Sequence, residues 1–276
     1  MSNSNLDYWD VDGQSLNTYA FNITTIGGDR VAPPRLRGGN LTIPYAVGQT
    51  YMPKVVDQKT MTLAFWVIGA DENGDIPTNR DMAAMYDTNY RKLRNLFWTP
   101  NREFVLTKRF YIDDVLKTAS AKAQFSSGLV PTMNGRARAV FTVDFVLADP
   151  YFYTPIVSTT LTTGTVSLTV EGDDITRAIT AEFAGARQFP KIKNNTLNVE
   201  FEYYLDLSSG DTAVVDVKKF KSTTTPSGVA AFTSSASIRH SGSPFWMELN
   251  PGVNSLALSS LTGIGVVTLK HQAVWL

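Results

Sequence analysis

The sequence is dominated by short segments in which apolar and polar residues alternate one by one. The two longest cover residues 60–68 and 139–147. In the second, Phe141, Val143 and Phe145 are separated by polar residues. A period of two places every second side chain on one face of a strand, so these segments predict half-buried antiparallel strands. Similar alternation occurs at 19–23, 165–170 and 197–205, and weaker strand patterns occur at 103–110, 177–183, 212–220, 245–249, 254–259 and 264–270.

One segment has a helical period instead. Between Arg80 and Trp98 the apolar residues are spaced three, four and seven apart, which predicts one amphipathic helix over about residues 79–98. Thr78 with Asp81 resembles a capping box, and Thr99-Pro100 is a stop signal. The stripe is rich in Met and Tyr, which pack equally well in a core or at an interface. The sequence therefore leaves open which helix face is buried.

Composition excludes several classes of protein. The chain has 25 basic and 25 acidic residues, so its net charge is zero, whereas a free-standing nucleic-acid binder needs a basic excess. Cysteine is absent and only two histidines occur, so thiolate chemistry is excluded and a histidine metal cluster is poorly supplied. The apolar runs are far shorter than the ~20 residues of a membrane span, and residues 1–12 do not read as a signal peptide. We expect a protein without a cofactor, metal or membrane insertion.

The best domain boundary is the segment 148–155, where two prolines bracket an aromatic cluster after a long strand. It divides the chain into domains 1–150 and 151–276. Within the first, residues 80–138 contain 11 basic and 5 acidic residues. This excess has two interpretations, a solvated helix face plus a hairpin, or a surface facing an acidic partner or passing nucleic acid.

Carboxylate pairs are the first catalytic candidates. Asp113-Asp114 and Asp173-Asp174 occur where turns are expected, and Asp is favoured in turns by its own backbone hydrogen bonds. Glu200 and Glu202 share one face of a strand, roughly 7 Å apart. That arrangement is more typical of the wet face of a sandwich than of a glycosidase cleft.

The two histidines and the exposed aromatics are weaker candidates. His240 has serine neighbours, but no Gly-x-Ser-x-Gly elbow is present. His271 lies in a terminal strand and is expected at the surface or at an interface. Trp246 and the pair Tyr203-Tyr204 could form a sugar platform, although such rings are more often core or interface residues. The sequence predicts no catalytic residue.

Three motifs, in order along the chain, resemble the distal tail (Dit) proteins of long-tailed bacteriophages. Residues 38–45 (Gly-Gly-Asn-Leu-Thr-Ile-Pro-Tyr) precede a strand, a glycine turn and one helix, as at the start of that family. Residues 149–152 (Asp-Pro-Tyr-Phe) resemble the family's exit from its first domain. Residues 251–254 (Pro-Gly-Val-Asn) resemble its late Pro-Gly-x-Asn turn.

The resemblance implies a mainly-β fold of two β-sandwich domains. The first would be a belt-like domain with one helix that builds a ring, in the family a hexamer, around a channel. The second would be a galectin-like jelly-roll sandwich without the sugar-binding residues of true galectins. The implied role is a structural subunit of the virion tail tip, made in the bacterial cytoplasm, with DNA passing only transiently.

The implied partners are other copies of the chain, the tail-tube protein, the tail-tip hub or tail-associated protein and the tape measure protein. For the basic helix residues Arg91, Lys92 and Arg94 we expect a protein partner, since strongly basic channel walls would retard DNA. Three alternatives stay open: a monomeric carbohydrate-binding module that recognises host glycans, a β-sandwich glycoside hydrolase and a tail-tube subunit.

Overall fold

The computed structural model divides into two compact units, Met1–Phe152 together with Leu276, and Tyr153–Trp275. We call them unit 1 and unit 2. The motif over residues 39–45, the strand residue Tyr19 and the helix stop at Thr99-Pro100 lie outside the described residues. The structure describes residues 8–16, 21–23, 34–38, 55–71, 75–98, 102–133, 135, 137–243, 245–260, 262–263 and 266–276.

Unit 1 is built on one antiparallel sheet whose strands follow the order β2-β1-β7-β8-β10-β6-β3. The predicted strands 60–68 and 139–147 are confirmed as β6 and β10, which pair along their whole length. The bounds are β1 Tyr8–Val11, β2 Gln14–Ser15, β3 Phe21–Ile23, β6 Lys59–Ile68, β7 Glu103–Ile112, β8 Val115–Gly128 and β10 Arg138–Leu147, with β9 (Thr132–Met133) paired to β10 and with β11 at Phe152–Tyr153.

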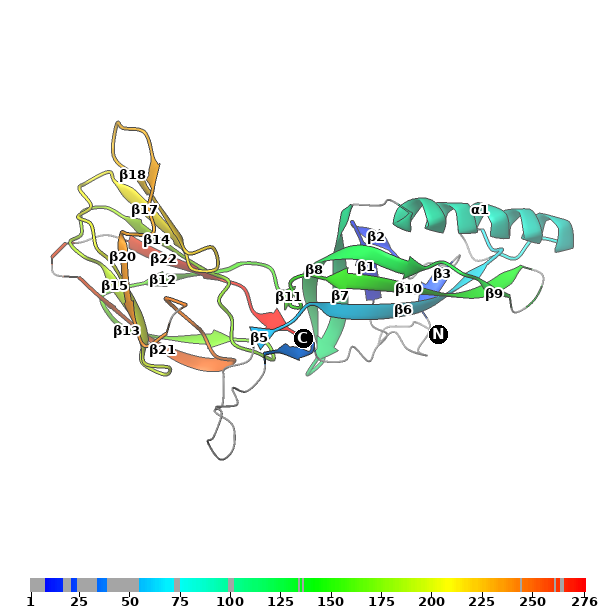
Figure 1. Cartoon of the computed structure of the whole chain (residues 1–276), viewed down its shortest axis with the longest axis horizontal. Coiled ribbons are helices and arrows are strands. Elements are labelled where there is room, and N and C mark those ends of the chain that lie inside the picture. Colours follow the sequence, from blue (N-terminus) through cyan, green and yellow to red (C-terminus); the bar gives the residue numbers. More distant parts are fainter. Residues whose placement is uncertain are drawn as a thin grey trace, which may run out of the picture. The chain divides into compact units, whose positions relative to one another are not determined.

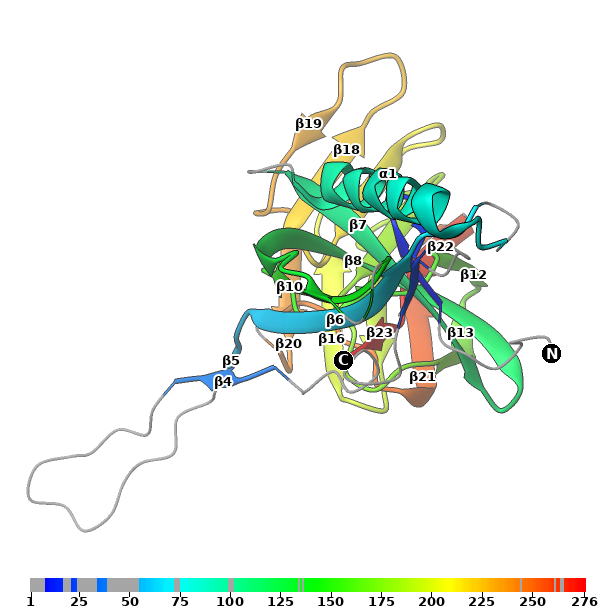
Figure 2. The same ribbon diagram turned by 90° about the vertical axis from the view of Figure 1, so that its right-hand side faces the viewer.

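A short two-stranded ribbon precedes β6. It consists of β4 (Leu36–Arg37) and β5 (Val55–Val56), which pair antiparallel. Figure 2 shows this ribbon standing apart from the main sheet of unit 1.

The predicted helix is confirmed as α1, Asn79–Phe97. It lies along one face of the unit 1 sheet (Figure 1). The ring of Phe97 contacts those of Phe104 and Phe145 edge-on, with centroids 6.4 and 5.5 Å apart. Tyr90 stacks on Phe141 at 5.3 Å. Alternation along β10 turns Phe141 and Phe145 to the same face, and the helix buries that face.

The helix begins differently from the expected capping box. Thr78 is the N-cap residue, but its side chain caps no backbone N–H. Its hydroxyl instead donates to the carboxylate of Asp81 at 3.1 Å, and the backbone N–H of Asp81 donates to the Thr78 carbonyl at 2.9 Å. Asp81 still places a negative charge in the first turn, where the helix dipole favours it.

Unit 2 is a sandwich of a six-stranded and a five-stranded antiparallel sheet, in the orders β12-β22-β14-β17-β18-β19 and β13-β21-β15-β16-β20. Phe183 of β14 contacts Phe201 of β16 at 6.3 Å, so the inner faces of the two sheets pack together. The bounds are β12 Val157–Leu161, β13 Gly164–Val170, β14 Ile179–Ala184, β15 Lys191–Asn194, β16 Val199–Tyr203, β17 Thr212–Asp216, β18 Lys221–Thr225, β19 Phe232–Thr233, β20 Ile238–Ser241, β21 Gly252–Ser259, β22 Val266–His271 and β23 Val274–Trp275.

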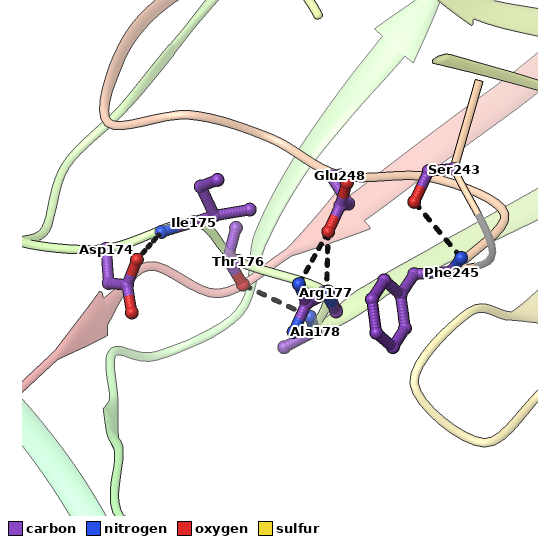
Figure 3. A network of polar contacts seen from close by, with 8 residues as sticks. All are labelled: Asp174, Ile175, Thr176, Arg177, Ala178, Ser243, Phe245 and Glu248. Atoms are coloured by element: carbon purple, nitrogen blue, oxygen red, sulfur yellow. Dashed lines mark hydrogen bonds and ion pairs between the residues drawn. The ribbon is translucent and has the colours of Figure 1, made fainter. Parts of the chain in front are cut away.

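The predicted strand at 245–249 is wrong. Trp246 has a φ of 62°, which a strand residue cannot adopt. Local side-chain contacts hold this segment as a loop. The Ser243 hydroxyl accepts from the Phe245 backbone N–H at 3.1 Å. Glu248 accepts from Nε of Arg177 at 2.8 Å, and that guanidinium lies over the Phe245 ring at 3.7 Å (Figure 3).

Candidate interaction surface

The outer face of α1 carries the three basic residues singled out in the sequence. Arg91, Lys92 and Arg94 are all exposed, while Leu93 and Phe97 face the core with 1% and 0% of their surface exposed. Within the described part of the chain, none of the three basic side chains forms an ion pair. The structure therefore settles which helix face is core, and it leaves three cations in contact with solvent.

An exposed tryptophan extends this face at the C-terminal end of the helix. Trp98 follows Arg91 and Arg94 at helical spacing, seven and four residues later, so the three side chains share one stripe. Trp98 is 65% exposed, and its ring meets that of Phe125 edge-on, with centroids 6.1 Å apart. Tryptophan and arginine are the residue types most enriched at the centres of protein interfaces. Lys92 lies on the exposed side of the helix but to one flank of this row. We call Arg91, Arg94 and Trp98, together with the flanking Lys92, the basic stripe.

A buried asparagine fixes the position of the helix on the sheet. Asn89 is 2% exposed, and its Nδ2 donates to the carbonyls of Ile68 at 2.9 Å and Ala70 at 3.0 Å. These carbonyls lie at and just beyond the end of β6, where the ladder with β10 stops. The helical pattern did not mark this residue, because asparagine reads as a solvent-facing position.

The pair Asp113-Asp114 forms the turn of the β7–β8 hairpin, as expected. Their φ values are 48° and 61°, the conformation of a two-residue type I′ turn, which aspartate tolerates. Both carboxylates are exposed. Beside them Tyr111, Val115 and Leu116 are 42%, 52% and 50% exposed, and Tyr111 lies directly opposite Leu116 in the ladder. We call these five residues the hairpin tip.

Glu200, Asp173 and Asp174, three of the other carboxylate candidates, have structural roles. Glu200 pairs with Lys191 at 2.7 Å, and this hydrogen-bonded cation lowers the pKa of Glu200 below its usual range. A general acid needs the opposite shift. Asp174 accepts from the backbone N–H of Ile175 at 2.7 Å (Figure 3), and the backbone N–H of Asp173 donates to the Val274 carbonyl at 2.9 Å, as turn residues do.

Within the described residues, neither histidine forms a hydrogen bond with a serine or threonine hydroxyl. His240 Nδ1 donates to the backbone oxygen of Ser243 at 3.0 Å, and the Ser243 hydroxyl is engaged with Phe245. His271 was expected at the surface or an interface, and this is wrong, because it is 3% exposed. It occupies a core-facing position of β22, which lies between β12 and β14. Burial lowers its pKa.

The three aromatic residues that the sequence suggested as a sugar platform do not form one. Trp246 and Tyr203 are buried, at 6% and 0%. Tyr204 is 38% exposed, but Phe189 stacks on its ring at 4.8 Å and the Arg239 guanidinium lies 3.1 Å from its centroid. Both neighbours contact the π-face that a sugar would need.

Among the described residues, no group of three or more histidine, cysteine, aspartate or glutamate side chains could hold a metal ion. No described helix is long and apolar enough to cross a membrane.

Comparison of the sequence with protein-family models and with curated proteins found no match. The fold, in contrast, matches solved structures. The crystal structure of the phage SPP1 Dit protein (gp 19.1), described as a paradigm of the hub adsorption apparatus in Gram-positive infecting phages, aligns with a TM-score of 0.62 at 15% identity, covering 98% of this chain and 100% of that one. The chain therefore has a Dit-like fold, and the mainly-β fold class with one helix is confirmed.

Two structures of the phage P2 baseplate in its activated conformation, with calcium and with strontium, align less closely. Their TM-scores are 0.40 and 0.39 at 7% identity, and each alignment covers 96% of this chain and 98% of the other. These similarities are too weak to add to the fold assignment.

Proposed function

We propose that this chain is a structural subunit of a bacteriophage tail tip, of the distal tail hub type, and that it is not an enzyme. The observation that supports this most strongly is the end-to-end structural match to the SPP1 hub protein, which extends over both units. A likeness confined to one sandwich would have fitted many unrelated proteins. The match over the whole chain favours the same two-part design.

The proposed assembly is a closed ring of identical subunits, six in number, built by unit 1 around a channel for DNA. A ring needs a heterologous interface that closes on itself. The zero net charge of the chain fits dense packing of copies, because like-charge repulsion between them is small. The exposed apolar and charged residues of the basic stripe and the hairpin tip are suited to such contacts.

The proposed location is the virion tail, where the ring would join the tail tube to the tip or baseplate and to host-recognition proteins. The tail-tube protein, the tail-associated hub protein and the tape measure protein are the proposed neighbours. We further propose that unit 2 corresponds to the galectin-like domain of the Dit family. Phe189 and Arg239 cover the aromatic ring of Tyr204, which disfavours the alternative of a glycan-binding module that uses this side chain.

The solution mass of the purified chain tests this proposal. One copy weighs 30.4 kDa, so a hexamer has a mass of about 182 kDa and light scattering separates the two states. We expect a stable species near the higher mass and a central pore in electron micrographs. A monomer that binds a glycan array would favour the carbohydrate-binding alternative.

A further inference from the structure

Two patches of opposite charge lie far apart on the surface of unit 1. The basic stripe contributes three cations and the hairpin tip contributes two carboxylates, and within the described residues none of these five charges has an ion-pair partner. Each patch also has exposed apolar surface, Trp98 in the first and Tyr111, Val115 and Leu116 in the second. Each patch thus combines exposed apolar side chains with charge of one sign, and the two signs are opposite.

The geometry of β7 prevents the two patches of one copy from meeting. Trp98 contacts Phe125 near the base of the hairpin, where Glu103 pairs with Gln124. The tip lies at the other end, where Ile112 pairs with Val115. Nine residue steps separate Glu103 from Ile112, which at about 3.3 Å per residue is roughly 30 Å. Figure 1 shows β7 starting beside the C-terminal end of α1 and running away from it.

We propose that the hairpin tip of one copy docks on the basic stripe of the next copy. This inference rests on the proposed function only in requiring that copies of the chain associate. The carboxylates of Asp113 and Asp114 would pair with Arg91 and Arg94, and Trp98 would pack against Leu116 and Tyr111. Because the two patches are different surfaces of the same unit, the contact is heterologous and can repeat from copy to copy.

Charge reversal on each patch tests the contact. The helix variant is Arg91→Glu with Arg94→Glu. The tip variant is Asp113→Lys with Asp114→Gly, in which glycine eases the positive-φ turn. We expect each variant to weaken self-association by about tenfold or more, measured by analytical ultracentrifugation at several salt concentrations. Asp113→Asn with Asp114→Gly should also weaken it, since Asn-Gly keeps the type I′ turn and removes only the charges.

Mixing the two reversed variants separates direct docking from damage to the fold. In an equimolar mixture the basic tip of the tip variant can dock on the acidic helix of the helix variant. The unchanged acidic tip of the helix variant can dock on the unchanged basic stripe of the tip variant. Assembly should therefore return, with the two variants alternating, which permits only even-numbered closed rings. The matched control reverses the exposed residues Asp206 and Lys221 of unit 2 and should leave association unchanged.

Single cysteines report the contact even where association is weak, because the chain has no cysteine of its own. One tagged copy carries Asp114→Cys and a differently tagged copy carries Arg94→Cys. A short bismaleimide should link the two kinds of copy to each other far more than either kind to itself. If both charge-reversed variants still form rings, the docking contact is wrong, while the proposal that the chain forms a ring stands. A wild-type chain that stays monomeric and gives no cross-link would overturn both.

Discussion

The side-chain amide of Asn194 donates to the side-chain oxygen of Asn254 at 3.0 Å, and both residues are fully buried in unit 2. Asn254 is the last residue of the Pro-Gly-Val-Asn motif. Its oxygen also accepts from the Asn250 backbone N–H at 2.9 Å, and its Nδ2 donates to the Asn250 carbonyl at 2.8 Å. The asparagine of this motif therefore closes its own turn and ties it to β15.

Replacing Asn254 by alanine should destabilise unit 2 by about 2–4 kcal/mol, because it leaves the buried side-chain amide of Asn194 and the part-buried backbone N–H of Asn250 without this partner. The midpoint of urea denaturation measures this loss. The matched control is Asn195→Ala, since Asn195 is exposed and its side-chain amide lies at 3.4 Å from the Ser255 hydroxyl, a long hydrogen bond. Equal effects of the two substitutions would contradict the role of the buried pair.

The glycines of unit 2 should differ in their tolerance of a side chain. Gly252 and Gly242 have φ values of 90° and 83°. A Cβ at Gly252 would meet nothing, whereas one at Gly242 would overlap the carbonyl oxygen of Asn198. Gly252→Ala should lose about 1–2 kcal/mol from backbone strain alone, and Gly242→Ala should lose clearly more. Thermal unfolding of both variants checks this order, and the reverse order would contradict it.

Truncating a side chain should lower the free energy of unfolding on the buried face of α1 and leave it almost unchanged on the exposed face. Leu93→Ala removes a core side chain and should lower the free energy of unfolding by about 2–4 kcal/mol. Lys92→Ala, one residue earlier on the exposed face, should change it by less than about 0.5 kcal/mol. Urea denaturation measures both values. A large loss from Lys92→Ala would mean that this side chain supports the fold rather than an interface.

Acid should weaken the protein through His271 before its carboxylates titrate. Burial lowers the pKa of His271 below the usual 6.5, so the unfolded chain takes up this proton at a higher pH than the folded chain. The stability that depends on neutral His271 is complete above pH 6.5 and is lost as the pH falls below it, by at most about 1.4 kcal/mol per pH unit.

Urea denaturation at pH 7.5 and 5.5 measures this loss. His271→Leu should flatten the dependence between these pH values. His240→Gln, which removes the exposed and only other histidine, should retain it. The expectation fails if His240→Gln flattens the dependence instead.

Strong periodicity in the sequence was sufficient to predict β6, β10 and α1, because one buried face imposes a regular spacing of apolar residues. It did not reveal β8, whose core-facing residues are Ala119, Ala121 and Ala123. Alanine is a poor strand former and gives no clear alternation. The apolar run at 245–249 misled for the opposite reason, since the positive φ of Trp246 cannot be read from its residue type.

The candidate surface could be found only in part from the sequence. Arg91, Lys92 and Arg94 were evident from charge counting, and Asp113-Asp114 was evident as a turn. Their complementarity was not, because it depends on the β7–β8 ladder, which carries the hairpin tip nine residue steps along β7 from Glu103. The exposure of Trp98 could not be predicted from the sequence either, since tryptophan is more often mostly buried.

Immunogold electron microscopy of purified virions tests the central claim most directly. Antibodies are raised against the full chain and applied to intact phage particles from the host that produces it. Our account predicts gold particles at the distal end of the tail, where the tube meets the tip. Label along the whole tube would identify a tube subunit instead, and virions without any label would contradict a structural role in the tail.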